Sequence, residues 1–220
     1  MNRKAFPTLQ SVVLCIVAAS GAVKAASSSI DAWDISQGSI VTTSSPTSYG
    51  VASNMFGDNH VDPFYPVEVG HTLFQEGQSA GFVNWVEWNS ASAIQLGGYN
   101  LTLIDDFQTG ERGISLFSLY GRLEETDLWQ LLDSYSPAVH PYSPYGPVLD
   151  PNAGFVEFEQ SASFSAISAK FFRAEFTQYS PSLGVRVAEL DAIVAVPEPS
   201  CYCLLISLSA VVPFYRKRSE

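Results

Sequence analysis

Short runs of β-branched and aromatic residues, separated by turn formers, fill the middle of this sequence and constrain its fold more than any other feature. The runs are Phe82–Trp88, Tyr99–Ile104, Ile114–Tyr120, Phe155–Glu159, Lys170–Phe176 and Val185–Leu190. Between them lie Gly97-Gly98, Gly110, Pro151-Asn152 and Ser180-Pro181-Ser182. Runs of this composition are typical of strands, and the intervening residues are typical of turns.

Helical periodicity is nearly absent from the same region. Between residues 26 and 196, only Glu124–Leu132 has leucines spaced for one helical face, which predicts a short helical turn there. A further strand is predicted within Ser27–Tyr49, whose few strong apolar residues include Trp33. Many short strands without helices predict an all-β fold, an antiparallel sandwich of the jelly-roll type.

The run that starts at Lys170, KFFRAEF, indicates how such a strand would lie. Phe172 and Phe176 share one face, whereas Arg173 and Glu175 share the other. This alternation predicts that one face packs on a core and the other meets solvent.

No cysteine falls in the strand-rich middle, because Cys15, Cys201 and Cys203 all lie near the two ends. Residues 26–196 therefore have no disulfide scaffold, and a hydrophobic core must hold them together. A domain of about 170 residues buries roughly 70% of the surface that its unfolded chain exposes, so one core is sufficient. We expect residues 26–196 to form a single domain.

The same region is strongly acidic. It holds 5 basic and 20 acidic residues, hence a formal charge of −15. This charge repels a phosphate backbone and argues against nucleic-acid binding. It favours solubility outside the cell and attracts divalent cations, of which calcium is the natural candidate.

The amino terminus has the layout of a secretory signal peptide. Two basic residues near the start precede an apolar region, residues 12–23, and a cleavage site at Val23-Lys24-Ala25. The alternative, a lipoprotein signal at Cys15, lacks the small residue expected before the cysteine. We predict that residues 1–25 are a signal peptide, used by the Sec machinery and then removed.

The carboxyl terminus combines a proline motif, an apolar stretch and a basic cluster. The motif is Pro197, Glu198 and Pro199, and the cluster is Arg216, Lys217 and Arg218. The 16 residues between them would extend roughly 24 Å as a helix, short of a hydrocarbon core of about 30 Å. By the positive-inside rule, the cluster stays in the cytoplasm and the residues before the motif lie across the membrane.

This arrangement, over residues 197–220, resembles the PEP-CTERM sorting signal of Gram-negative bacteria. The resemblance implies handling by an exosortase, a membrane transpeptidase that cuts near the Pro-Glu-Pro motif. The short transmembrane helix would then occupy the inner membrane only transiently, before release to the cell surface, outer membrane or extracellular matrix. The alternative is an ordinary membrane anchor with a Pro-rich linker, and the mass of the mature carboxyl terminus would distinguish the two.

A second resemblance covers about residues 54–194. The stretches WVEWNSASAIQLGGYNLTL, ISLFSLYG and AKFFRAEFTQYSPSLGVRVAELDAIV are similar to discoidin-like, or galactose-binding-like, jelly rolls. The positions that carry the pattern are Arg173, Phe176, Gly184, Arg186, Glu189 and Leu190.

This resemblance implies a structural calcium ion held by an early loop and a carboxylate of the last strand. In this chain the loop would supply Asp58, Asn59 and Asp62, and the last strand would supply Glu189. Ca²⁺ takes about six to eight oxygen ligands, which such residues provide. The alternative is an Asx-type turn whose carboxylates are solvated.

Catalytic patterns are weak. The pentapeptide GQSAG, Gly77–Gly81, matches a nucleophile elbow centred on Ser79, but an elbow lies between a strand and a helix, and here strand-like residues follow. Glu157 and Glu159 mimic the carboxylate pair of a glycosidase, although same-face acids on a strand are more often a solvated surface. We expect no enzymatic activity, with a hydrolase that uses Ser79 as the alternative.

Aromatic residues in a Pro-rich segment favour ligand binding instead. Residues 133–151 contain five prolines, which exclude a central strand. The segment holds Tyr135, His140, Tyr142 and Tyr145, whose flat rings would stack on sugars while the prolines keep the loop stiff. Alternatively, the tyrosines pack the loop against the sandwich.

We therefore predict an exported, non-enzymatic protein of the cell surface or matrix that binds carbohydrate or exopolysaccharide. A purely structural matrix protein without a ligand pocket is the alternative.

Overall fold

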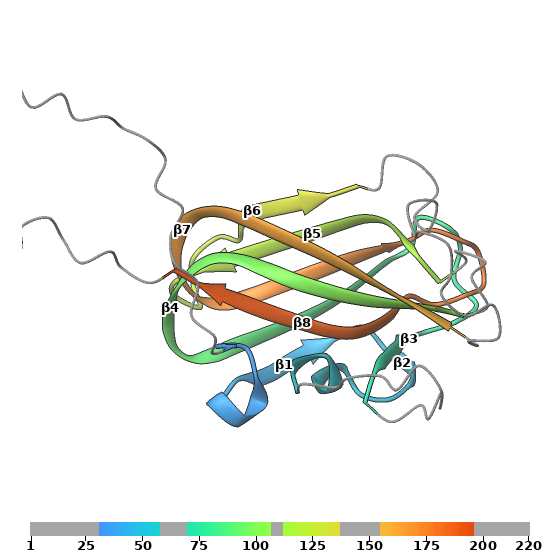
Figure 1. Cartoon of the computed structure of the whole chain (residues 1–220), viewed down its shortest axis with the longest axis horizontal. Helices are drawn as coiled ribbons and strands as arrows, with labels where there is room; N and C mark the ends of the chain where they lie inside the picture. The colour runs from blue at the N-terminus through green and yellow to red at the C-terminus, as the bar shows by residue number, and fades with distance from the viewer. Residues whose placement is uncertain (1–30, 58–69, 107–111, 137–154, 196–220) are drawn as a thin grey trace, which may run out of the picture.

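The computed structural model describes residues 31–57, 70–106, 112–136 and 155–195, which form one antiparallel β-sheet folded over on itself (Figure 1). The strands are β1 (Ile40–Ser44), β2 (Thr47–Tyr49), β3 (Thr72–Phe74), β4 (Val83–Asp106), β5 (Ile114–Arg122), β6 (Gln130–Tyr135), β7 (Phe155–Gln178) and β8 (Arg186–Val194). The helical segments in these ranges are two short 3₁₀ helices, η1 (Ile35–Gln37) and η2 (Ala52–Phe56). Within the described ranges, neither helix has the length and apolar character needed to span a membrane.

Two long strands, β4 and β7, organise the molecule. Each has 24 residues, and the two pair with each other through both halves of the fold. The register shifts between Asn89 and Ile94 and again between Leu96 and Gly98, and such bulges bend a strand. Both strands curve strongly in Figure 1, so each contributes one half to each layer of a sandwich.

The pairing of the other strands defines the two layers. Layer 1 consists of β1, the first half of β4, the second half of β7, β5 and β6. Layer 2 consists of β2, β3, β8, the second half of β4 and the first half of β7. The sandwich therefore has β6 at one edge of layer 1 and the first half of β7 at the matching edge of layer 2.

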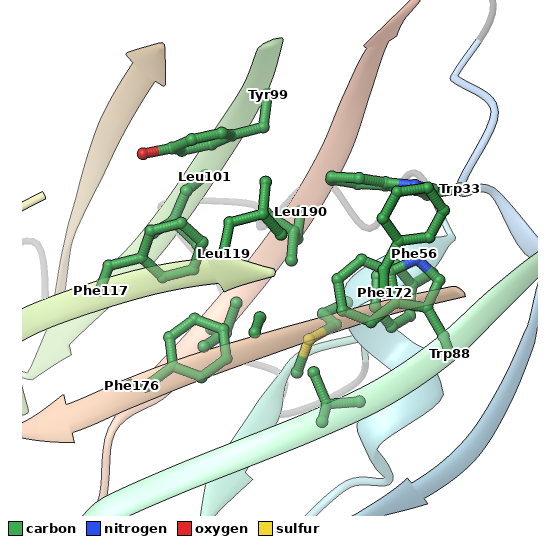
Figure 2. Packing of buried hydrophobic residues seen from close by; sticks show 14 of the residues in the cluster. Trp33, Phe56, Trp88, Tyr99, Leu101, Phe117, Leu119, Phe172, Phe176 and Leu190 are labelled. Atoms are coloured by element: carbon green, nitrogen blue, oxygen red, sulfur yellow. The ribbon is translucent and has the colours of Figure 1, made fainter. Parts of the chain in front are cut away.

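A core rich in aromatic side chains lies between the layers (Figure 2). Trp33, Trp88 and Phe172 form one group, with ring centroids 5.0 to 5.5 Å apart. Tyr99 in layer 2 meets Phe117 in layer 1 at 5.1 Å. Full burial of one such side chain stabilises the fold by about 1.5–3 kcal/mol, so this core can replace the disulfides that the domain lacks.

The predicted antiparallel β-sandwich is confirmed, and the alternation predicted for β7 is also correct. Phe172 and Phe176 are fully buried, while Arg173 and Glu175 are partly exposed. Trp33, one of the apolar residues of the strand predicted within Ser27–Tyr49, is fully buried but lies just before η1, and the strands in that stretch are β1 and β2.

The prediction of a turn at Gly97-Gly98 is wrong, because both glycines lie inside β4. The predicted strands 82–88 and 99–104 are therefore parts of one strand. A Cβ atom on Gly98 would lie 2.1 Å from the carbonyl oxygen of Ala162 on β7. Glycine is needed here for a close approach between strands, not for a turn.

The prediction of a helical turn over 124–132 is also wrong. Glu124 and Asp127 form a tight turn, and β6 begins at Gln130. Leu132 packs on the core whereas Leu131 is 52% exposed, which is the alternation of a strand. Residues 133–135 of the Pro-rich segment belong to this edge strand, and the prolines follow it.

Candidate functional site: the aromatic face

The outer surface of layer 1 carries a set of aromatic side chains that do not enter the core. They are Trp85 on β4, Phe171 on β7, Tyr120 on β5 and Trp129 in the connection between β5 and β6. Each side chain is partly exposed, and Trp85, Tyr120 and Phe171 each have one neighbour in the chain that is buried in the core, namely Val86, Leu119 and Phe172. We call this surface the aromatic face.

Pairing between strands fixes the positions of these rings. Tyr120 lies opposite Arg173, and Phe171 lies opposite Arg122, so Phe171 and Tyr120 are diagonal neighbours on adjacent strands. Diagonal neighbours in an antiparallel pair are roughly 8 Å apart. The Phe171 and Tyr120 side chains therefore lie close together on the outer surface of the β5–β7 pair.

A charged network crosses the middle of the face. The Arg173 side chain donates from Nε to Glu175 and from Nη1 to Glu87, both at 2.8 Å. The guanidinium also lies over the Trp85 ring, 4.9 Å from its centroid. The Tyr120 hydroxyl lies 3.4 Å from the second oxygen of Glu175. Three adjacent strands thus hold Arg173 in one orientation.

A second cationic group covers the end of the face nearest β6. The Arg122 guanidinium lies 4.1 Å from the Trp129 ring centroid, and its Nη1 donates to the carbonyl of Asp127 at 3.2 Å. Arg122 and Lys170 both lie within 6 Å of the Phe171 centroid. Cation–π contacts of this kind contribute about 0.5–1 kcal/mol at exposed sites.

Gly121 lets β6 close over this end of the sheet. A Cβ atom there would lie 2.8 Å from Leu132 Cδ1 and 3.2 Å from Ala169 Cβ. Without that atom, Leu132 fills the space beside the glycine and β6 stays paired with β5. The glycine thereby helps to place Trp129 beside Arg122.

The charges of the aromatic face are mixed. Arg122, Lys170 and Arg173 are three of the five basic residues between residues 26 and 196. Glu87 and Glu175 lie on the same face, and the neighbouring turn adds Glu124, Glu125 and Asp127. Acidic groups therefore outnumber basic ones around the face, as they do in the whole domain.

Among the predicted binding residues, the structure describes Tyr135. It lies on β6, and its ring packs on Phe158 of β7 with centroids 6.3 Å apart. Burial raises the pKa of its hydroxyl. This packing joins the edges of the two layers. Ligand binding by Tyr135 stays a prediction. His140, Tyr142 and Tyr145 lie outside the described residues.

Among the predicted calcium ligands, the structure describes Glu189. It lies on β8 opposite Thr102 of β4, half-buried on the outer surface of layer 2. Asp58, Asn59 and Asp62 lie outside the described residues. No group of three or more metal-ligating side chains is present within the described ranges. The calcium site stays a prediction.

The sorting motif, Pro197, Glu198 and Pro199, lies outside the described residues, as does the basic cluster Arg216, Lys217 and Arg218. The same is true of the predicted signal peptide.

Of the residues in the two catalytic patterns, the structure describes the side chains of Ser79 and Glu159. Ser79 is in an exposed turn, where its carbonyl accepts a hydrogen bond from Phe82, and β4 follows instead of a helix. This arrangement lacks the strand–turn–helix context of a nucleophile elbow. Glu159 is exposed on β7.

The aromatic face was not found by reading the sequence. Each of its strand residues belongs to a predicted strand, and period-two alternation could have placed Trp85 and Phe171 opposite the buried side. The sequence does not reveal that β4, β7 and β5 are neighbours in that order, and this order brings the rings together.

Comparison with known proteins gives similarity of fold without similarity of sequence. No family model and no curated protein matches the chain. A solved allantoicase structure aligns with 76% of this chain at 10% identity and a TM-score of 0.52. The chain spans 44% of the length of that enzyme, and this match shows the fold alone.

Two other solved structures have TM-scores just below 0.5. The module CBM32-3 from a family 31 glycoside hydrolase of Clostridium perfringens aligns with 73% of this chain and 93% of its own, at 14% identity and a TM-score of 0.49. The lectin domain of lectinolysin, solved with Lewis B antigen, aligns with 76% of this chain and 100% of its own, at 18% identity and a TM-score of 0.48.

Proposed function

We propose that this chain is an exported, non-enzymatic carbohydrate-binding protein and that the aromatic face is its binding surface. The observation that carries the proposal is the succession of partly exposed rings, Trp85, Tyr120, Phe171 and Trp129, on a solvent-facing sheet. None of these four rings belongs to the core or packs against it, so the packing of the core does not account for them.

The chemistry of the face suits a glycan. Sugar rings have apolar C–H surfaces that pack on flat aromatic side chains, while their hydroxyls need hydrogen-bonding partners at fixed places. Phe171 and Tyr120 supply the flat surfaces, and the ion pairs of Arg173 supply polar groups beside them. Because strands hold these groups in place, little conformational entropy is lost on binding.

The sequence resemblances complete the proposal. The domain would be a discoidin-like jelly roll between a signal peptide, residues 1–25, and a PEP-CTERM signal, residues 197–220. Export through the Sec machinery and processing by an exosortase would deliver it to the surface or extracellular matrix of a Gram-negative bacterium. Mass spectrometry of the mature protein tests this part, since an intact Glu220 would support a permanent membrane anchor instead.

A structural calcium ion, held by Glu189 together with Asp58, Asn59 and Asp62, is a further part of the proposal. Glu189 is half-buried on β8, and carboxylate oxygens of this kind are ligands that Ca²⁺ prefers. Dialysis against a chelator should lower the melting temperature and added Ca²⁺ should restore it. An unchanged melting temperature would contradict the metal.

Glycan binding is tested with the full chain by affinity electrophoresis in gels that contain polysaccharides. Phe171→Ala should lower the affinity about five- to tenfold, because it removes one stacking surface. Tyr49→Ala is the matched control, since Tyr49 is an exposed aromatic residue on β2, away from the face. Equal retardation of both variants and the wild type would refute binding at the aromatic face.

A further inference from the structure

Building on the proposed function, we infer that Arg173 and Glu87 make the aromatic face selective for neutral glycans, by binding pairs of adjacent hydroxyl groups. The class of ligand follows from the hydrogen-bonding groups of Arg173 and Glu87 that other described residues do not use.

Arg173 keeps donors that its protein partners do not use. A guanidinium has five N–H groups. In the described part of the chain, Arg173 uses one on Nε for Glu175 and one on Nη1 for Glu87. Its side chain is 26% exposed, so the remaining donors have access to solvent. They are held in a fixed plane because two carboxylates and the Trp85 ring hold the group.

Glu87 places an acceptor beside these donors. Its Oε1 accepts from Arg173, and Oε2 accepts no hydrogen bond from any side chain of the described residues. The Glu87 side chain is 21% exposed. Within the described part of the chain, Arg173 therefore keeps an unused donor and Glu87 an unused acceptor, and the ion pair between them holds the two groups side by side. Adjacent hydroxyls on a sugar ring fit this arrangement, since one can accept from Arg173 while the other donates to Glu87.

The charge around this pair disfavours an acidic sugar. Arg173 lies between two carboxylates, Glu87 and Glu175, so the network carries a net negative charge. The positive charge of Arg122 faces the Trp129 ring, and the turn that supplies its carbonyl partner contributes three further acids. A glycan carboxylate placed at Arg173 would meet this negative charge, because that cation is already paired with two carboxylates, whereas a neutral hydroxyl pair has no such cost.

The test compares a neutral polysaccharide with its acidic counterpart, galactan with polygalacturonate, together with a glucan and a mannan. Binding of the purified full chain is measured by affinity electrophoresis and by calorimetry at low salt. We expect at least one neutral polymer to bind about tenfold more tightly than polygalacturonate. Tighter binding of polygalacturonate than of every neutral polymer would overturn the inference.

Glu87→Gln is the decisive variant, since it keeps the shape and an oxygen for Arg173 but loses the charged acceptor. We expect it to lower the affinity for the neutral polymer at least about fivefold, as expected for a lost hydrogen bond to a charged group. The matched control is Glu76→Gln, which changes an ion pair to Arg112 that lies away from the face. Arg173→Lys should also weaken binding, because lysine cannot keep the planar set of donors.

The outcomes separate the two proposals. If Phe171→Ala weakens binding but Glu87→Gln binds like the wild type, the face binds glycans and the inference fails. If no polysaccharide binds to the wild type, both fail. Melting curves of each variant show whether a loss of affinity comes from unfolding.

Discussion

Replacing Tyr99 by phenylalanine should reduce the loss of unfolding free energy that this protein suffers at alkaline pH. Tyr99 is fully buried on β4, and its hydroxyl donates to Asp133 Oδ2 of β6 at 2.9 Å. This bond joins layer 2 to the edge strand of layer 1. In Figure 2 the Tyr99 ring lies near Phe117, with its hydroxyl oxygen pointing away from the group around Trp33.

Burial, and then the hydrogen bond and the charge of Asp133, raise the pKa of Tyr99 far above its ordinary value. In the unfolded chain the phenol ionises near pH 10. Below that pH both states keep the proton, so the contribution of Tyr99 is fully present. Above it the unfolded state loses the proton while the folded state keeps it, and the free energy of unfolding falls by about 1.4 kcal/mol per pH unit.

The Tyr99→Phe variant has no such proton to lose. At pH 8 it should be less stable than the wild type by about 1.5–3 kcal/mol, the contribution of a hydrogen bond to a charged group. Between pH 8 and pH 11 the difference should shrink by about 1.4 kcal/mol, because only the wild type is destabilised through this residue. The other titrating groups are common to both proteins and cancel in the difference.

Urea unfolding at a series of pH values, followed by the fluorescence of the buried Trp33 and Trp88, measures both free energies. Tyr49→Phe is the control, because Tyr49 is 38% exposed. A difference between the wild type and Tyr99→Phe that stays constant from pH 8 to pH 11 would refute a buried, neutral Tyr99.

Three further predictions concern the stability of the sandwich, each measured by urea unfolding. Asn84→Leu should stabilise it by about 1–2 kcal/mol, because this side chain is fully buried and neither amide atom has a hydrogen-bond partner in the described part of the chain; Asn100→Leu, which loses the bond from Ser161, should give no gain. Gly98→Ala should cost more than about 2 kcal/mol and Gly121→Ala less, because the first meets backbone and the second meets the end of a flexible leucine; equal costs would contradict this explanation. Trp33→Ala should cost about 3–5 kcal/mol, since its ring contacts both Trp88 and Phe172, and a loss below 1 kcal/mol would show that η1 and its flanks do not anchor on the core.

Much of the fold could be predicted because a strand with one buried face shows a local alternation of apolar and polar residues in the sequence. The alternation of Phe172 with Arg173 follows from the two-residue period of a strand, which holds whatever the strand pairs with. The absence of cysteines from the domain likewise required a large apolar core, and the aromatic cluster around Trp88 supplies it. These features depend on neighbours in the sequence or on composition.

The bends of β4 and β7 could not be predicted in this way. Gly97-Gly98 has the composition of a turn, and only the close approach of Ala162, far along the chain, makes it part of a strand. The leucines after Glu124 fit a helix as well as a strand, and pairing with β5 decides between them. In both cases the deciding contact is remote in sequence.

The sequence by itself determined that this chain folds as strands with one apolar side, because that pattern follows from residue types and their local alternation. Tertiary structure alone decided which strands are neighbours, and therefore that Trp85, Tyr120, Phe171 and the Arg173 network share one face. The physical reason is that the direction of a side chain is set within its own strand. Its neighbours on the face of a sheet are set by pairing between segments up to about a hundred residues apart.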